Sequence, residues 1–201
     1  SGAATVLLPD LRGHGPDPER RGDVDFIGQF EDDIAALINQ VKADDQKVVL
    51  AGHSSGGGLA IRFSGGKHRH LIDAAVLIAP FLKYNAPTMR PNSGGWAHAL
   101  VRRTIGLTML NWAGITALNH LTAIQFAFPD TVLNGPDGGS ATTAYSYRLN
   151  TGYAPRGKAI KDIAALPRFL LIAGREDEAF HATKFEPMMS AHNGNGSYVI
   201  V

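Results

Sequence analysis

The segment from Lys47 to Phe63 reads KVVLAGHSSGGGLAIRF, and it decides how the rest of the chain is interpreted. Its first five residues, of which the last four are apolar, favour a β-strand, and its last five are compatible with a helix. Between them, Gly52-His53-Ser54-Ser55-Gly56 matches Gly-x-Ser-x-Gly, a motif that is weak alone but strong at a strand-to-helix junction. The sequence therefore predicts a sharp turn that projects the Ser54 hydroxyl from the end of a strand.

So tight a turn leaves no room for side chains two residues before and two residues after the serine, and Gly52 and Gly56 meet that need. His53 flanks Ser54 and is expected to point away from it. The backbone N–H of Ser55, at the start of the helix, can donate to a developing oxyanion. A phosphate-binding loop is disfavoured, because the turn holds neither Gly-x-Gly-x-x-Gly nor Gly-Lys-Ser/Thr.

Further apolar runs predict additional strands of one mainly parallel sheet, alternating with helical stretches. The run at 74–79 is continuously apolar, which is typical of a strand covered on both faces. An amphipathic helix is expected from Ile27 to Val41, with Asp25 as its cap. The sequence therefore predicts an α/β fold. Its other strands are expected at residues 5–8, 169–173 and 198–201.

About 85 residues separate Pro80 from the strand at 169–173, far more than an ordinary crossover connection needs. We therefore expect a core formed by residues 1–80 and 156–201, into which residues 81–155 insert a helical cap. Within the cap, a helix is predicted over residues 96–110, followed by a second apolar stretch.

The composition excludes several classes of function. A chain of 201 residues that is 44% hydrophobic and 18% charged can bury one sizeable core. Its net charge of +1 gives no reason to expect a nucleic-acid-binding surface. The absence of cysteine excludes disulfides, a thiol nucleophile and cysteine-based metal sites. We predict no metal or other cofactor, and we interpret His68 and His70 as part of a solvated basic turn without nearby carboxylates. No apolar run approaches the roughly 20 residues of a membrane span.

Three segments together resemble the α/β-hydrolase family, in particular its monoacylglycerol lipases, lysophospholipases and related esterases. They are LPDLRGHG at 8–15, GHSSGG at 52–57 and LIAGRED at 171–177, in the order and spacing of the family. Pro16 stands where the family usually has a serine, which affects the turn and not the chemistry. The resemblance implies an α/β-hydrolase fold and a serine hydrolase that cleaves carboxylic esters through a Ser-His-Asp triad.

The resemblance implies that Ser54 is the nucleophile and that Ser55 N–H contributes to the oxyanion hole. The family's catalytic acid falls three residues after the glycine that ends its strand, which is Asp177 here. Glu176 and Glu178 are its neighbours and stay open as alternatives. The family's histidine follows the last strand, but in this chain the strand predicted at 198–201 is the end of the sequence. His181 and His192 precede that strand, and we interpret both as surface residues.

Two earlier strands of the family are not found, one of which lies in the sheet between the strands expected at 5–8 and 47–51. We therefore expect a fragment of a longer hydrolase, incomplete at both ends and inactive by itself. The implied substrate is a lipid-like or small acyl ester. Alternatives are an amidase or peptidase on the same scaffold, or a non-catalytic binding protein. The compartment stays open. The cap is expected to form an acyl pocket from Trp96, Leu100, Leu107, Met109, Leu110 and Phe126.

Overall fold

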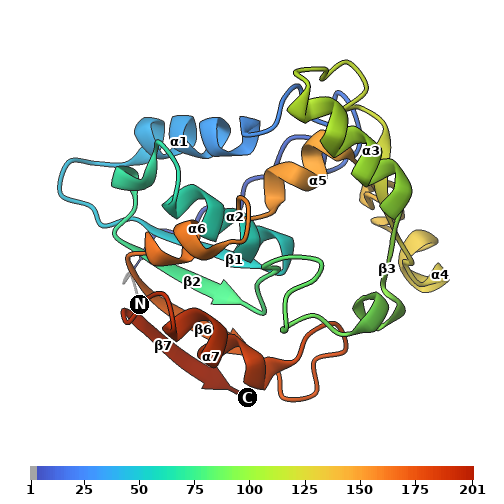
Figure 1. Ribbon diagram of the computed structural model, residues 1–201. Helices are drawn as coiled ribbons and strands as arrows, with labels where there is room; N and C mark the ends of the chain where they lie inside the picture. The colour runs from blue at the N-terminus through green and yellow to red at the C-terminus, as the bar shows by residue number, and fades with distance from the viewer. Residues whose placement is uncertain (1–3) are drawn as a thin grey trace.

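A four-stranded parallel sheet forms the centre of the computed structural model, which describes residues 4–201 (Figure 1). The strands follow the order β1-β2-β6-β7, and every neighbouring pair is parallel. The parallel sheet predicted from the sequence is confirmed. The four strands are β1 (Val49–His53), β2 (Ala74–Ile78), β6 (Arg168–Ala173) and β7 (Gly196–Ile200).

Three helices, α2 (Ser55–Ser64), α6 (Ile160–Ala164) and α7 (Phe185–Ser190), share one hydrophobic core with alternate residues of the sheet. Leu77 of β2 and Leu171 of β6 are fully buried in this core. Alternate strand residues point to opposite faces of a sheet, so the intervening residues lie on the other face. That other face is partly open, with Val49, Ile78 and Val199 exposed. The expectation that residues 74–79 are covered on both faces is therefore wrong, because the helices that pack on β2 lie on one side.

The amphipathic helix predicted near residue 27 is present as α1 (Gln29–Val41). Its Phe30, Ile34 and Ile38 form a second core with α2 and with α5 (Tyr147–Tyr153). The cap position differs from the prediction, because Gly28 is the N-cap, at φ 102°. Asp25 instead exchanges hydrogen bonds with the Gln29 side chain.

The predicted strand at residues 5–8 is absent. Residues 4–10 adopt no regular structure, and Leu8 is 92% exposed. A strand requires a neighbour that accepts and donates its backbone hydrogen bonds. In the described chain β1 pairs only with β2, and residues 5–8 pair with no described strand, so this apolar run is not held in the extended form by a hydrogen-bonded neighbour.

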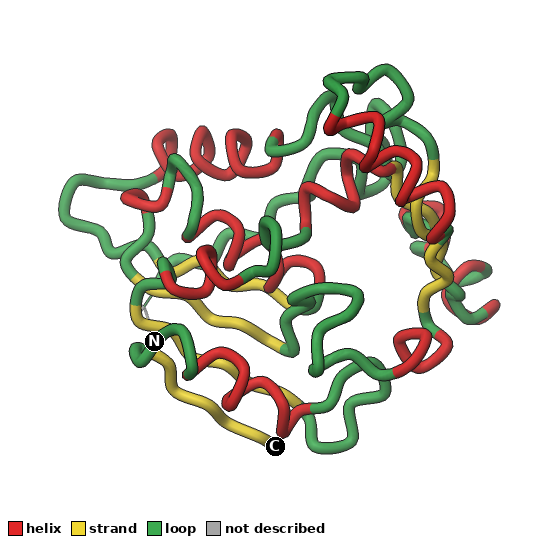
Figure 2. The backbone as a smooth tube through the Cα atoms, in the orientation of Figure 1, coloured by secondary structure: helices red, strands yellow, loops and turns green. Residues whose placement is uncertain are grey.

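The segment between β2 and β6 is not purely helical, as Figure 2 shows by its strands and helices. Its β3 (Ala97–Ala99), β4 (Thr122–Phe126) and β5 (Ala144–Ser146) form a small antiparallel sheet. The predicted helix over 96–110 is present only as α3 (Val101–Trp112), because residues 97–99 pair with β4. The division into a core and a cap remains a prediction. The shorter elements are α4 (Asp130–Leu133) and the 3-10 turns Arg69–Leu71, Pro91–Gly95, Gly138–Ser140 and Ala182–Lys184.

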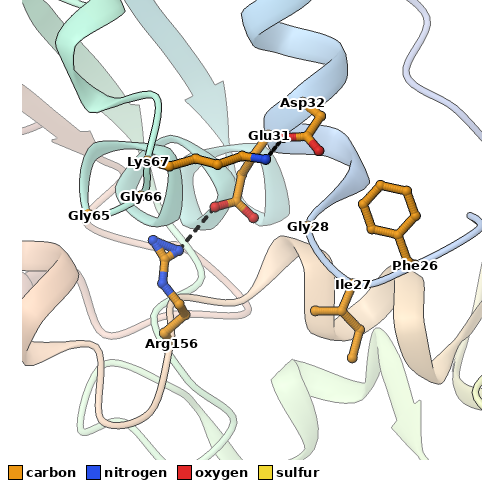
Figure 3. Close-up of a pocket in the computed structure, with 9 residues that line it drawn as sticks. All are labelled: Phe26, Ile27, Gly28, Glu31, Asp32, Gly65, Gly66, Lys67 and Arg156. Carbon is orange, nitrogen blue, oxygen red and sulfur yellow. Dashed lines mark hydrogen bonds and ion pairs between the residues drawn. The ribbon is translucent and has the colours of Figure 1, made fainter. Parts of the chain in front are cut away.

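Buried charges join α1 and α2 to the segment before α6. Arg62 Nε donates to Glu31 Oε2 at 2.6 Å, and Arg156 Nη1 donates to Glu31 Oε1 at 3.0 Å. Figure 3 shows the Arg156 side chain directed at Glu31. Arg156 Nη2 also lies 3.4 Å from Asp162 Oδ1. A buried charge is costly unless it is paired. Removing one partner of this network would leave another charge buried without a partner, which lowers the stability of the fold by more than the intact network contributes to it.

His14 connects the turn after residue 10 to β5 and α5. Its Nδ1 lies 3.1 Å from Arg12 O, a carbonyl that can only accept, so Nδ1 carries the proton. Its Nε2 then accepts from the Tyr145 hydroxyl at 3.1 Å. The ring packs edge-on against Tyr145 and Tyr153. Burial lowers the pKa of His14 below the ordinary value of 6.5.

The lowered pKa of His14 predicts a loss of stability in mild acid. The unfolded chain binds this proton more tightly than the folded chain, so stability is complete above the unfolded pKa of 6.5 and falls as the pH drops toward the folded value. The free energy of unfolding, measured by urea titration at about pH 7.5 and about pH 5.5, should therefore be smaller at the lower pH. In His14→Gln this difference should shrink, whereas exposed His192 provides the control variant His192→Gln. An unchanged pH dependence in His14→Gln would contradict the assignment.

Candidate active site

The carboxyl ends of the parallel strands bring Ser54 and the turn containing Asp177 to the same edge of the sheet. Ser54 directly follows β1, and Asp177 follows β6. One strand, β2, separates β1 from β6, which places those two strands about 9 to 10 Å apart at the usual spacing. A third side chain positioned between them could contact both residues.

Ser54 occupies a strained backbone conformation between β1 and α2, with φ 49° and ψ −113°. A residue with a side chain rarely adopts this conformation, which costs on the order of 1 to 3 kcal/mol. Backbone hydrogen bonds hold it in place: Ser54 N–H donates to Ile78 O, and Ser54 O accepts from Gly58 and Phe81 N–H. The sharp turn predicted from the Gly-x-Ser-x-Gly motif therefore has the expected backbone.

The glycines after the serine allow α2 to approach the loop that follows β2. A Cβ on Gly57 would lie 2.8 Å from Pro80, and a Cβ on Gly58 would lie 2.5 Å from Phe81 O. A Cβ on Gly52 would lie 2.2 Å from Gly56 O. Gly56 differs from the expectation, because a Cβ there meets nothing within 4 Å. Gly52 is thus required by close approach as predicted, and the crowding beyond the serine falls on Gly57 and Gly58.

This contact pattern predicts opposite effects for two neighbouring alanine substitutions. Gly58→Ala should destabilise the fold by about 2 kcal/mol, because its Cβ meets backbone oxygen atoms that cannot move aside easily. Gly56→Ala should leave stability unchanged or raise it by up to about 1 kcal/mol, because it removes unfolded-state freedom without a clash. Urea unfolding of both variants measures the difference. Equal destabilisation by the two substitutions would contradict the proposed packing of α2.

The Asp177 carboxylate caps its own turn. Its Oδ1 accepts from the backbone N–H groups of Ala179 at 2.9 Å and Phe180 at 2.8 Å. Asp177 is half-buried, whereas Glu176 and Glu178 are exposed. Of the three acidic neighbours that the sequence left open, Asp177 is therefore the one whose carboxylate the turn holds in a fixed orientation.

Arg90 braces this turn, and sequence reasoning missed it. Its Nε donates to Asp177 O at 2.8 Å and lies 3.2 Å from Phe180 O. Its backbone N–H donates to Ala179 O, and the adjacent Met89 forms an isolated antiparallel bridge with Phe180. The loop after β2 is thus fastened along the loop after β6. No local motif marks Arg90, because its partners lie nearly 90 residues away in the chain.

The two histidines that follow Asp177 are not hydrogen-bonded to the candidate catalytic side chains. His181 donates its backbone N–H to Thr88 O, and its side chain makes no hydrogen bond with Ser54 or Asp177. His192 is exposed after α7. His53, at the end of β1, is also exposed.

The six residues predicted to form an acyl pocket do not all lie together. Leu107 is buried beside Ala123 and Tyr147, and Leu110 packs against the same small core. Met109 is exposed on α3. Trp96 and Phe126 lie with their ring centroids 6.0 Å apart, and Leu100 N–H donates to Ala123 O. The structure therefore groups Leu107 with Leu110 and Trp96 with Phe126, while Met109 points outward.

Two surface cavities lie away from Ser54 and Asp177. One, of about 360 Å³, is drawn in Figure 3 and lies between the start of α1, the end of α2 and Arg156. The other, of about 570 Å³, is lined by residues of the 9–19 segment and α1. Beside the first, Asp32 Oδ1 lies 2.8 Å from both Lys67 Nζ and His68 Nε2. The basic turn therefore has a carboxylate neighbour, contrary to expectation. Within residues 4–201, no three His, Asp or Glu side chains gather closely enough to hold a metal ion.

The model of the alpha/beta hydrolase family matches residues 1–199. The chain belongs to this family. Its described helices include none that is both long and apolar enough to cross a bilayer.

Similar proteins with known structures include a monoglyceride lipase from Saccharomyces cerevisiae, at 15% identity and a TM-score of 0.63. The superposition covers 95% of this hydrolase chain and 66% of the lipase chain. A thermophilic esterase from Thermogutta terrifontis superposes with a TM-score of 0.56 at 19% identity, over 96% of this chain and 69% of the esterase. At such low identity the likeness supports the fold alone.

A curated relative in sequence is the phospholipase YtpA of Bacillus subtilis strain 168. It is 31% identical over 77 residues, which are 38% of this chain and 30% of the phospholipase. The matched part of this alpha/beta hydrolase thus spans less than a third of that relative's length.

Proposed function

We propose that this alpha/beta hydrolase contributes the nucleophile and the acid of a serine hydrolase that cleaves carboxylic esters. The observation that carries the proposal is the strained Ser54 backbone at a strand-to-helix turn. The fold itself does not require a serine here, since a glycine would adopt the same backbone conformation without steric strain. Strain held by surrounding hydrogen bonds is typical of a residue whose side chain must be presented in one direction.

The surroundings of Ser54 suit attack on an acyl carbon. Ser55 is the first residue of α2, so its backbone N–H has no acceptor within the helix. That N–H and the positive end of the helix dipole would stabilise the negative oxygen that forms when Ser54 Oγ attacks a carbonyl carbon. Asp177, with its carboxylate fixed by two N–H groups, would orient a histidine and stabilise its protonated form.

The proposal assigns the base to a histidine that follows β7 in a longer natural chain. Two backbone hydrogen bonds place Val201 beside the end of β6: Val201 N–H donates to Ala173 O, and Arg175 N–H donates to Val201 O. A continuation of the chain would therefore start at the edge of the sheet where Asp177 lies. Reading the coding sequence past Val201 tests this assignment. A histidine within about 15 to 25 residues, in a loop, supports it, and a stop codon directly after Val201 overturns it.

The substrate class proposed is a lipid-like or small acyl ester. Support comes from the names of similar proteins, which are a monoglyceride lipase, an esterase and a phospholipase. The apolar side chains contributed by α3 and β4 are compatible with an acyl chain. Comparing kcat/KM for matched ester and amide substrates of the natural protein separates an esterase from the alternative amidase or peptidase.

A second candidate is a non-catalytic binding protein with the same fold. This candidate is favoured because the described chain shows no histidine base at the site. Neither His181 nor His192 forms a side-chain hydrogen bond with Ser54 or Asp177. Without a base, the serine is a weak nucleophile. The two candidates differ in whether Ser54 reacts covalently.

Labelling with a fluorophosphonate probe should distinguish these candidates. The natural full-length protein should be labelled at Ser54, because a triad raises the nucleophilicity of this hydroxyl. Ser54→Ala should abolish the label, and Ser55→Ala, which keeps the backbone N–H, provides the matched control that retains it. Mass spectrometry locates the modified residue. A folded full-length protein that takes no label would support the binding protein instead.

The 201-residue chain alone should turn over p-nitrophenyl esters at a rate near background. Loss of one member of a triad lowers kcat by about 10⁴- to 10⁶-fold. Residual turnover should be the same in His181→Ala and His192→Ala as in the unmodified chain. Substantial turnover that either substitution abolishes would show that the base lies within this chain and that our assignment is wrong.

A further inference from the structure

Helix α3 is apolar on two opposite sides. Leu107 is buried in a small core with Ala123 and Tyr147, and Leu110 packs against that core. A second set of apolar side chains recurs at intervals of four, four and three residues and falls within an arc of about 80° on the helix. This set is exposed, with Val101 and Ile105 at 56%, Met109 at 60% and Trp112 at 83% of their full surface.

A surface helix ordinarily has one apolar stripe that faces the core and a polar opposite side. Single exposed apolar residues are common, whereas an ordered row of four on one helix marks a surface that is covered in use. Figure 1 shows α3 at the outer edge of the molecule, away from the central parallel sheet. We name the set Val101, Ile105, Met109 and Trp112 the outer face of α3.

The charges around the outer face indicate what covers it. Residues 74–129 contain four Lys and Arg residues and no Asp or Glu, whereas the remainder of the chain has 15 Lys and Arg against 18 Asp and Glu. Two of these cations, Arg102 and Arg103, are exposed on α3 itself. Arg102 lies about 100° from Val101 around the helix, at the border of the outer face. Arg103 lies about 200° from Val101, on the other side of the helix, where its side chain donates to Thr122 O.

We propose that the outer face of α3 docks on a lipid surface that contains anionic headgroups. A helix lies in the plane of a membrane when it combines an apolar face with flanking cations and a large aromatic residue. Trp112, at the C-terminal end of the face, has an indole ring that favours the boundary between headgroups and acyl chains. Arg102 would neutralise headgroup charge, and no acidic residue of the helix opposes it. The proposal concerns docking and does not depend on the reaction assigned to Ser54.

Binding of the 201-residue chain to vesicles tests the proposal. Vesicles of phosphatidylcholine mixed with phosphatidylglycerol should sediment with the protein, and vesicles of phosphatidylcholine alone should bind it more weakly. Trp96→Phe leaves Trp112 as the one tryptophan of the sequence. In that variant the fluorescence should shift to shorter wavelength on binding, because the indole leaves water. Raising the salt concentration should weaken binding to the anionic vesicles.

Substitutions in and beside the outer face test whether vesicles bind through this face or through any exposed apolar surface of the protein. Ile105→Glu should weaken binding about tenfold or more, because it removes an apolar side chain and adds a repelled charge. Arg102→Gln should weaken binding to the anionic vesicles about fivefold and leave binding to phosphatidylcholine unchanged. Val41→Glu is the matched control, since Val41 is an exposed apolar residue at the end of α1 and does not belong to the outer face. It should bind as the unmodified chain does.

Circular dichroism establishes that each variant is folded before binding is compared. The proposal is overturned if the folded chain does not bind phosphatidylglycerol vesicles, or if Ile105→Glu binds them as well as the unmodified chain. It is also overturned if the chain self-associates without lipid and Ile105→Glu makes it monomeric, since a second copy would then cover the outer face.

Discussion

The close passage of α2 over the end of β1 is the constraint on which the rest of the structure depends. A strand that turns directly into a helix must reverse direction at one residue, and Ser54 does so at positive φ. Gly57 and Gly58 then allow the helix to contact Pro80 and Phe81 at backbone distance. Because α2 contributes to both large hydrophobic clusters, its path fixes α1 and α5 on one side and α6 on the other.

The parallel sheet places this local turn beside the other residues of the candidate site. Parallel strands end at a common edge, so the residue after β1 and the turn after β6 face the same region without being close in sequence. The turn after β6 is fixed by its own carboxylate and by Arg90 from the loop after β2. The loop after β2 therefore contacts both candidate catalytic residues. Its Phe81 N–H donates to Ser54 O, and its Arg90 holds the turn that contains Asp177.

The segment between β2 and β6 has a different physical character from the sheet that carries it. Its small antiparallel sheet and α3 enclose only a minor core, and much of its apolar surface stays exposed. Its first part, residues 79–129, contains no Asp or Glu, unlike the rest of the chain. In the proposed hydrolase this segment would meet the lipid surface while the strand ends hold the reacting groups, so that recognition of the surface and chemistry belong to separate elements.

The sequence by itself determined the parallel strands and α1, because continuous apolar runs and a 3.6-residue period are local signals. The motif around Ser54 likewise predicted its turn, since tight backbone geometry restricts residue types within a few positions. Only the tertiary structure decided that residues 5–8 form no strand, that residues 97–99 pair with β4, and that Arg90 braces Asp177. Those outcomes depend on partners distant in the chain. A segment's own residues show what it favours, but whether a partner is present to satisfy its hydrogen bonds is settled only when the chain is folded.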